Sequence, residues 1–158
     1  MHSGGIFHAS DYLLEKLDAI QPRFLRDLGI TEEEAFLEFN FAPTQLRRNI
    51  GILGLLHKRV IGESHPIFCK LLPFCHEVGM PFLPGGHNKQ LYNHLHEVQF
   101  QLALFFRSIF AMVHVYNLLP QYVVDARDVK DFQKHLTRIA RLHCTAGANN
   151  WQNQFSRR

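Results

Sequence analysis

The sequence predicts a mostly α protein, arranged as an irregular helical bundle with a Pro/Gly-rich central linker. Apolar residues recur at the helical period in several segments, with charged residues on the opposite side. Residues that favour helix ends, such as Thr31, Asp128 and Gly62, stand at the borders of these segments. With 158 residues, 46% of them hydrophobic, the chain can bury one core. We therefore expect one helical domain or two tightly packed helical lobes.

The N-terminal part begins with a flexible leader, residues 1–9, which contains two glycines and no periodicity. From Asp11 to Leu28 the spacing predicts an amphipathic helix whose apolar side faces the core. That side consists of Leu13, Leu14, Leu17, Ile20, Phe24, Leu25 and Leu28. Pro22 lies on the polar side, where water can satisfy the freed carbonyl, so we expect a kink there. Gly29 is expected to end the helix.

Two further helices complete the region 10–62. Thr31 and Glu34 form a capping-box pattern, which predicts a short helix reaching about Asn40. The next helix is expected from Thr44 to Ile61, with cations gathered on its outer side: Arg47, Arg48, Lys58 and Arg59. Gly51 and Gly54 lie among them and indicate the close approach of protein backbone or phosphate. A solvated basic face is the alternative interpretation.

Residues 63–97 are expected to form the linker, because prolines and glycines interrupt them repeatedly. A short helix should run from His65-Pro66 through Leu72, and the remainder should pack through Phe74, Met80, Phe82 and Leu83. Several residues of this segment have metal-ligand chemistry, among them Cys69, Cys75, His76, His87, His94 and His96. Their spacing does not match the paired ligands of a zinc site. We therefore predict no metal and no cofactor.

The region 98–145 should contain two helices and be followed by a polar, frayed tail, residues 146–158. Apolar residues surround the first helix, 98–119, almost completely, which predicts the most buried helix of the protein, ended by Pro120. Asp128 should cap the second, from Val129 to His143. Its outer cations fall within a narrow arc: Lys130, Lys134, Arg138 and Arg141. A solvated basic face is the alternative interpretation for this helix as well. Trp151 is the only large anchor expected in the tail.

Two stretches of the chain resemble parts of LINE-type reverse transcriptases. Tyr116-Asn117-Leu118-Leu119-Pro120, followed by the helix with Phe132, is similar to the C-terminal Trp-Asn-x-Leu-Pro and Phe-containing helix of that family. Tyr116 stands in place of the family's Trp, and its terminal Cys-His knuckle is absent. The first half is similar to the thumb-like helices that follow the polymerase palm, and these residues carry the match: Ile20, Gln21, Leu25, Arg26, Leu46, Arg47 and Arg48. The resemblance implies a thumb and C-terminal appendage that lack the catalytic palm.

The composition and the missing motifs narrow the function classes. Nucleotidyl transfer needs paired carboxylates for two metal ions, and the chain has no Asp-Asp pair; we predict no catalytic residues and no enzyme activity. The net charge of +3 is mildly basic, and two basic helix faces lying side by side could follow the phosphate backbone of RNA or DNA. The odd number of cysteines fits a reducing compartment, cytoplasmic or nuclear, and no stretch is apolar enough for a membrane span.

Two interpretations remain open. The chain contacts nucleic acid while a polymerase palm supplied elsewhere performs the chemistry. Alternatively, it is a decayed relic with no nucleic-acid role and at most a protein-interaction function.

Overall fold

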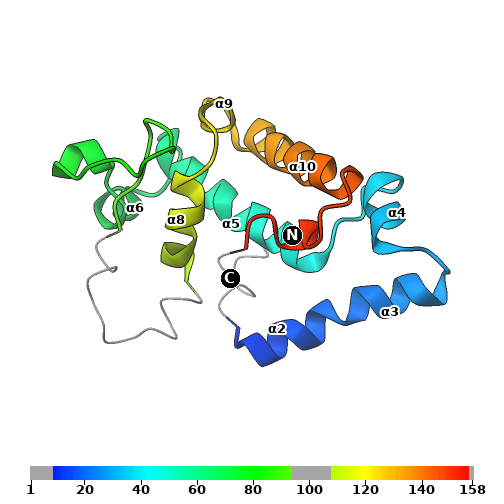
Figure 1. The fold of residues 1–158 in the computed structure, drawn as a ribbon. Helices are drawn as coiled ribbons and strands as arrows, with labels where there is room; N and C mark the ends of the chain where they lie inside the picture. Colours follow the sequence, from blue (N-terminus) through cyan, green and yellow to red (C-terminus); the bar gives the residue numbers. More distant parts are fainter. Residues whose placement is uncertain (1–8, 94–107, 157–158) are drawn as a thin grey trace.

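The computed structural model describes residues 9–93 and 108–156 (Figure 1). The helices in chain order are α2 (Asp11–Asp18), α3 (Ile20–Asp27), α4 (Glu32–Leu37), α5 (Thr44–Val60), α6 (Pro66–Leu71), η1 (Cys75–Val78), η4 (Ile109–Ala111), α8 (Met112–Asn117), α9 (Gln121–Val124), α10 (Val129–Thr145) and η5 (Trp151–Asn153). Extended pairing within the described ranges is limited to one isolated antiparallel bridge between Phe74 and Leu91. The predicted mostly helical class is confirmed.

The core forms where α5 packs against α10, the two long helices in Figure 1. Leu53 and Leu56 of α5 and Phe132 of α10 are fully buried. A Cβ atom on Gly54 would lie 2.6 Å from the Gln133 side-chain nitrogen and 3.2 Å from Val129 Cγ1. A close approach at Gly54 is therefore present, but it is made by side chains of α10 and not by the protein backbone that the sequence analysis expected.

Tyr116 of α8 fills the centre of the core and is completely buried. Its hydroxyl lies 3.1 Å from His57 Nδ1, while His57 Nε2 lies 3.0 Å from the carbonyl oxygen of Ala126. Because a carbonyl only accepts, His57 carries its proton on Nε2 and accepts the Tyr116 hydroxyl proton at Nδ1. The His57 ring also stacks on Phe132, with centroids 4.1 Å apart. Residues 98–107 of the predicted 98–119 helix lie outside the described ranges; residues 109–117 form η4 and α8.

The linker folds back onto α8 through buried amide side chains. Asn117 accepts from the Leu91 backbone N–H at 2.9 Å and donates to the Leu91 carbonyl at 2.8 Å. Gln90, fully buried, bonds in the same two-way manner to the backbone of Leu83. Phe74 packs on the core, but the expected packing through Met80, Phe82 and Leu83 is wrong, because these side chains stay exposed while the backbone of Leu83 is held.

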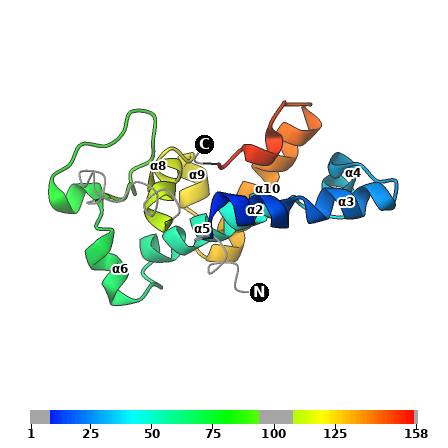
Figure 2. The ribbon, with the colours of Figure 1, turned by 90° about the horizontal axis from the view of Figure 1, so that it is seen from below.

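α2 and α3 follow one another along the lower edge of the molecule and pass across α5 when seen from below (Figures 1 and 2). The helix predicted from Asp11 to Leu28 is interrupted at Ala19, because Pro22 has no N–H that could donate to the Asp18 carbonyl. The predicted inward face is right for Leu25 but wrong for most of its other residues. Gln21 and Leu25 are buried, whereas the following apolar side chains are exposed: Leu13, Leu17, Ile20, Phe24 and Leu28.

The cap predicted at Thr31 is confirmed: its hydroxyl accepts from the Glu34 N–H at 3.1 Å, and the Glu34 carboxylate accepts from the Thr31 N–H at 2.9 Å. α4 ends at Leu37, three residues earlier than expected. The expected fraying after Thr145 is wrong for residues 146–156. Trp151 stacks on Phe36 with centroids 5.1 Å apart, and both rings are buried in the hydrophobic core.

Candidate nucleic-acid interface

α10 presents a row of cations on the side away from the core. Its buried positions are Phe132, Leu136, Ala140 and Cys144, spaced four residues apart. The same spacing places Lys130, Lys134 and Arg138 on an exposed side, each about 6 Å further along the helix axis. These three residues are called the basic stripe. Asp128 caps the helix, accepting from the Asp131 N–H at 2.8 Å, as the sequence predicted.

The three side chains of the basic stripe are exposed to solvent. In the described ranges, no hydrogen bond or ion pair holds Lys130, Lys134 or Arg138. The pKa of the Asp128 carboxyl is lowered, chiefly by the hydrogen bond from the Asp131 N–H and to a lesser degree by Lys134 and Lys130. The stripe can therefore offer its donors to an external anion. Arg127, exposed in the turn before α10, is a further cation that the sequence analysis did not include.

Arg141, the fourth cation predicted on this helix, ties α10 to α4. Its guanidinium donates to the Phe36 carbonyl at 3.0 Å and to the Asn40 side-chain oxygen at 3.2 Å. It also lies 5.4 Å from the Phe36 ring centroid. Arg141 is partly buried, so it supports the fold more than it extends the stripe.

On α5 the expected single basic face divides into two. Arg47 and Lys58 are three turns apart and exposed, whereas Arg48 and Arg59 lie one position further round the helix and are each 6% exposed. Grouping the four cations on one outer face was wrong, because adjacent helical residues point about 100° apart. The two buried guanidiniums have internal partners and do not form a surface.

Arg48 joins α5 to α2. Its two terminal nitrogens each donate to a carboxylate oxygen of Asp18 at 2.6 Å, a bidentate pair. Such pairs are among the strongest charge-assisted contacts in proteins, and removing one partner leaves a buried charge. Arg48 therefore fixes the position of the α2–α3 segment.

Arg59 holds the linker at the other end of α5. Its Nε donates to the Leu72 carbonyl at 3.0 Å, and a terminal nitrogen donates to Glu77 at 3.4 Å. The guanidinium lies over the Phe74 ring, 4.4 Å from the centroid. All three contacts fasten residues 72–77 to the core, so Arg59 is a structural residue.

The two exposed cations of α5 differ in their surroundings. Arg47 donates to the Gln21 side-chain oxygen at 3.3 Å and lies 5.3 Å from the Phe41 ring centroid. Lys58 has no partner among the described residues. With a separation of eleven residues, the two are about 16 Å apart along α5. They are separate surface cations and do not form a continuous stripe.

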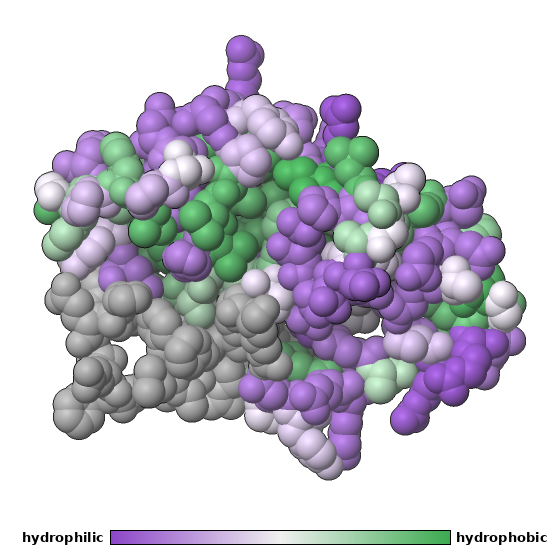
Figure 3. Space-filling model, in the orientation of Figure 1, coloured by the Kyte–Doolittle hydropathy of each residue, from purple (hydrophilic) through white to green (hydrophobic). Residues whose placement is uncertain are grey.

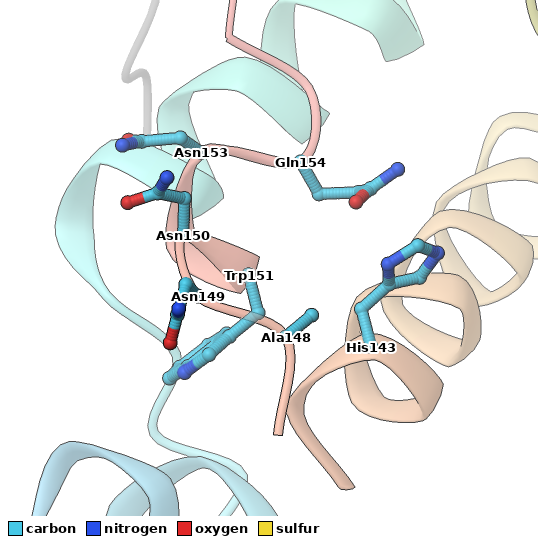
Figure 4. Close-up of a pocket in the computed structure, with 7 residues that line it drawn as sticks. All are labelled: His143, Ala148, Asn149, Asn150, Trp151, Asn153 and Gln154. Atoms are coloured by element: carbon cyan, nitrogen blue, oxygen red, sulfur yellow. The ribbon is translucent and has the colours of Figure 1, made fainter. Parts of the chain in front are cut away.

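A shallow hollow of about 440 Å³ opens beside the end of α10 (Figure 4). It is lined by His143, Ala148, Asn149, Asn150, Trp151, Asn153 and Gln154. Amide groups dominate this lining, and it contains no carboxylate or thiol that could pair with His143. The hollow therefore offers hydrogen-bonding groups without an evident nucleophile.

The other chemical groups of the described ranges are not arranged for metal binding or thiol chemistry. No cluster of three or more His, Cys, Asp or Glu side chains suited to a metal ion occurs among these residues. Burial raises the pKa of the Cys75 and Cys144 thiols, which disfavours the reactive thiolate. Within the described ranges, no helix has the length and apolar character needed to cross a membrane.

No protein-family model, curated protein or solved structure matches this chain. The resemblance to LINE-type reverse transcriptases stays a prediction.

Proposed function

We propose that this chain is a non-catalytic helical module that contacts the phosphate backbone of RNA or DNA through the basic stripe. The observation that carries the proposal is the row of Lys130, Lys134 and Arg138, all exposed and all without a partner in the described ranges. Phosphate contacts of this kind position a protein on nucleic acid without reading its sequence. We therefore expect binding that depends on salt and little on base sequence.

The supporting cations are fewer than the sequence indicated. Arg47 and Lys58 are exposed and can add phosphate contacts. Arg48, Arg59 and Arg141 act within the fold and are left out of the surface. The chain would be a fragment derived from a LINE-type polymerase, and the palm would be supplied elsewhere. The alternative is a relic with no nucleic-acid role.

The test is the salt dependence of binding to a labelled RNA or DNA duplex, measured by fluorescence anisotropy. Three neutralised phosphates predict a slope of about −2.7 for the logarithm of affinity against the logarithm of salt concentration on duplex DNA. Reversing two charges of the stripe, Lys134→Glu with Arg138→Glu, should weaken binding and make the slope shallower by about 1.8. Both side chains are exposed, so the fold should survive, which circular dichroism can verify.

The matched control reverses two exposed lysines on other helices, Lys16→Glu with Lys70→Glu. This changes the net charge by the same amount but should leave affinity and slope nearly unchanged. An equal loss in both double variants would mean general attraction of a basic protein to a polyanion, and the relic interpretation would then stand. Arg48→Glu is unsuitable as a probe, because it would place a second carboxylate against Asp18 inside the protein.

A further inference from the structure

One buried histidine of the linker is bonded in a way that only its neutral form allows. His87 is 3% exposed, and both of its ring nitrogens have backbone partners. Nε2 lies 3.0 Å from the Tyr116 carbonyl oxygen, and Nδ1 lies 3.0 Å from the backbone nitrogen of Lys89. Because a carbonyl only accepts and a backbone N–H only donates, Nε2 carries the ring proton and Nδ1 carries none. A second proton on His87 would therefore set one N–H against another.

His57, the other buried histidine in contact with Tyr116, does not have this restriction. Its Nδ1 partner is the Tyr116 hydroxyl, which can rotate and accept a hydrogen bond instead of donating one. The Lys89 N–H has no such freedom, because it is part of a planar peptide group. Of the two histidines, His87 is therefore the one whose protonation breaks a backbone contact.

The charged groups around His87 give its protonated form no free counterion among the described residues. Asp125, at the end of α9, already accepts from the Lys89 ammonium at 2.7 Å. Burial lowers the pKa of His87; the hydrogen bond to the Tyr116 carbonyl opposes this, Lys89 lowers the pKa further and Asp125 raises it. From α8, the Tyr116 ring meets His87 edge-on, with centroids 5.3 Å apart. Two other carboxylates of this region act on His57 and not on His87: Asp128 and Glu63.

The segment around His87, residues 83–90, contributes no side chain to the hydrophobic core. The core includes Leu72, Phe74 and Leu91 but none of the residues between 83 and 90. Among the described residues, hydrogen bonds join the segment to the rest of the protein in these pairs: His87 with Tyr116, Asn88 with Gln121, Lys89 with Val124 and Asp125, and Gln90 with Cys75. Each such bond contributes about 0.5–1.5 kcal/mol to stability. The loss of one or two of them is therefore enough to shift the balance between an attached and a detached segment.

Both ends of the segment allow it to detach. On the C-terminal side, Leu91 is buried and bonded in both directions to Asn117, which provides a fixed point. On the N-terminal side, Met80 and Phe82 are exposed and lie outside the core. Residues 72–77 are fastened separately by Arg59. The segment can therefore leave α8 and α9 while its neighbours stay in place.

We propose that residues 83–90 form a latch that opens in acid: a proton taken up by His87 releases the segment from α8 and α9, while the rest of the described fold stays in place. Hydrophobic residues already gather at the surface where Figure 1 places α8 (Figure 3), and opening adds the edge of the Tyr116 ring to them. In the detached segment His87 has the ordinary histidine pKa, near 6.5, so acid favours the open form. The ratio of open to closed molecules should rise about tenfold between pH 7.5 and pH 5.5.

The three cysteines distinguish opening of the latch from unfolding of the whole protein. Cys69 is exposed, whereas Cys75 and Cys144 are buried. The Cys75 N–H donates to the Gln90 carbonyl at 2.9 Å, so Cys75 loses part of its cover when the latch opens. Cys144 lies in α10 as part of the core and becomes accessible only when the fold itself is lost.

The experiment labels the wild type with dipyridyl disulfide, which reacts with thiols in acid as well as at neutral pH, and follows each cysteine by mass spectrometry. The rate at Cys69 corrects for the pH dependence of the reagent. Relative to Cys69, the rate at Cys75 should rise about tenfold from pH 7.5 to pH 5.5, while Cys144 stays unlabelled. A constant relative rate at Cys75 overturns the proposal. An equal rise at Cys75 and Cys144 also overturns it, because the whole protein would then be unfolding.

Two variants test whether His87 is the group that takes up the proton. His87→Gln should make the relative rate at Cys75 independent of pH, whether the latch of this variant is closed or open, because the titrating ring is gone. The matched control, His114→Gln, removes an exposed histidine of α8 and should keep the rise of the wild type. A rise retained in His87→Gln, or lost in His114→Gln, overturns the assignment to His87. No residue of the latch belongs to the basic stripe, so the outcome is separable from nucleic-acid binding.

Discussion

The substitution Trp151→Ala should destabilise the protein strongly, although Trp151 lies in a polar C-terminal segment. Trp151 is 4% exposed, stacks on Phe36 with an interplanar angle of 1°, and donates from Nε1 to Glu33 at 3.3 Å. Truncating a buried Trp costs about 3–5 kcal/mol. For a chain of this length, that corresponds to a fall in melting temperature of about 10 °C. Trp151→Phe keeps the stacking and loses one half-exposed hydrogen bond, so its cost should be about 1 kcal/mol.

Urea unfolding followed by circular dichroism measures these differences. A change in stability shifts the midpoint of the transition, and an unchanged slope of the unfolding free energy against urea concentration shows that the same surface is exposed on unfolding. Asn153→Ala is the control, as its side chain is exposed in the same segment and should change stability by less than about 0.5 kcal/mol. The wild type offers an independent observation: its single Trp should be shielded from a soluble quencher. A Trp151→Ala variant as stable as the control, together with a freely quenched Trp, would refute the packed tail.

Three further predictions concern the core, a helix cap, two buried histidines and the linker. Phe132→Ala should lower the free energy of unfolding by about 3–5 kcal/mol, because it empties a buried position. Thr31→Ala removes an exposed helix cap and should lower it by about 1 kcal/mol. Equal effects of the two variants in urea unfolding would contradict the assigned core. Burial lowers the pKa of His57 and of His87, so both are neutral in the fold, and their stabilising contribution is complete above the unfolded pKa, near pH 6.5. The free energy of unfolding should therefore decrease as the pH drops below that value, and it should decrease more steeply in the wild type than in His57→Gln. Parallel pH profiles of the two proteins would refute this. A Cβ at Gly86 would overlap a backbone carbonyl oxygen of α8, so Gly86→Ala should destabilise the protein by about 1–3 kcal/mol in the same assay. If this variant is as stable as the wild type, the linker does not pack against α8 at this position.

Features encoded within a few residues were predictable from the sequence. The bounds of α5, the caps at Thr31 and Asp128 and the exposed cations of α10 all depend on local spacing and hydrogen bonding. The burial of Arg48 was not predictable, because it depends on Asp18, thirty residues away. A cation is normally assigned to the surface unless its partner is known.

The α2–α3 segment shows a second limit of sequence reasoning. Two stripes lie side by side on it: Leu13, Leu17, Ile20 and Phe24 form one, and Leu14, Asp18, Gln21 and Leu25 form the other. Hydrophobic periodicity favours the first as the inner side. The structure turns the second inward, because Arg48 and the backbone at residues 41–42 supply partners for its polar groups. Polar residues can therefore determine which side of an amphipathic helix is buried when tertiary partners exist for them.

The stacking of Trp151 on Phe36 also affects how the chain reaches its folded state. The hydrogen bond between Glu33 and Trp151 spans 118 positions, and that between Gln152 and Glu32 spans 120. Contacts so far apart in sequence close a long loop, which is entropically costly and slows folding. During synthesis, α4 emerges well before the ring that covers its apolar side. A nascent chain therefore carries Phe36 without its stacking partner until residue 151 is made, and this interval is when the N-terminal helices are most open to association with other chains.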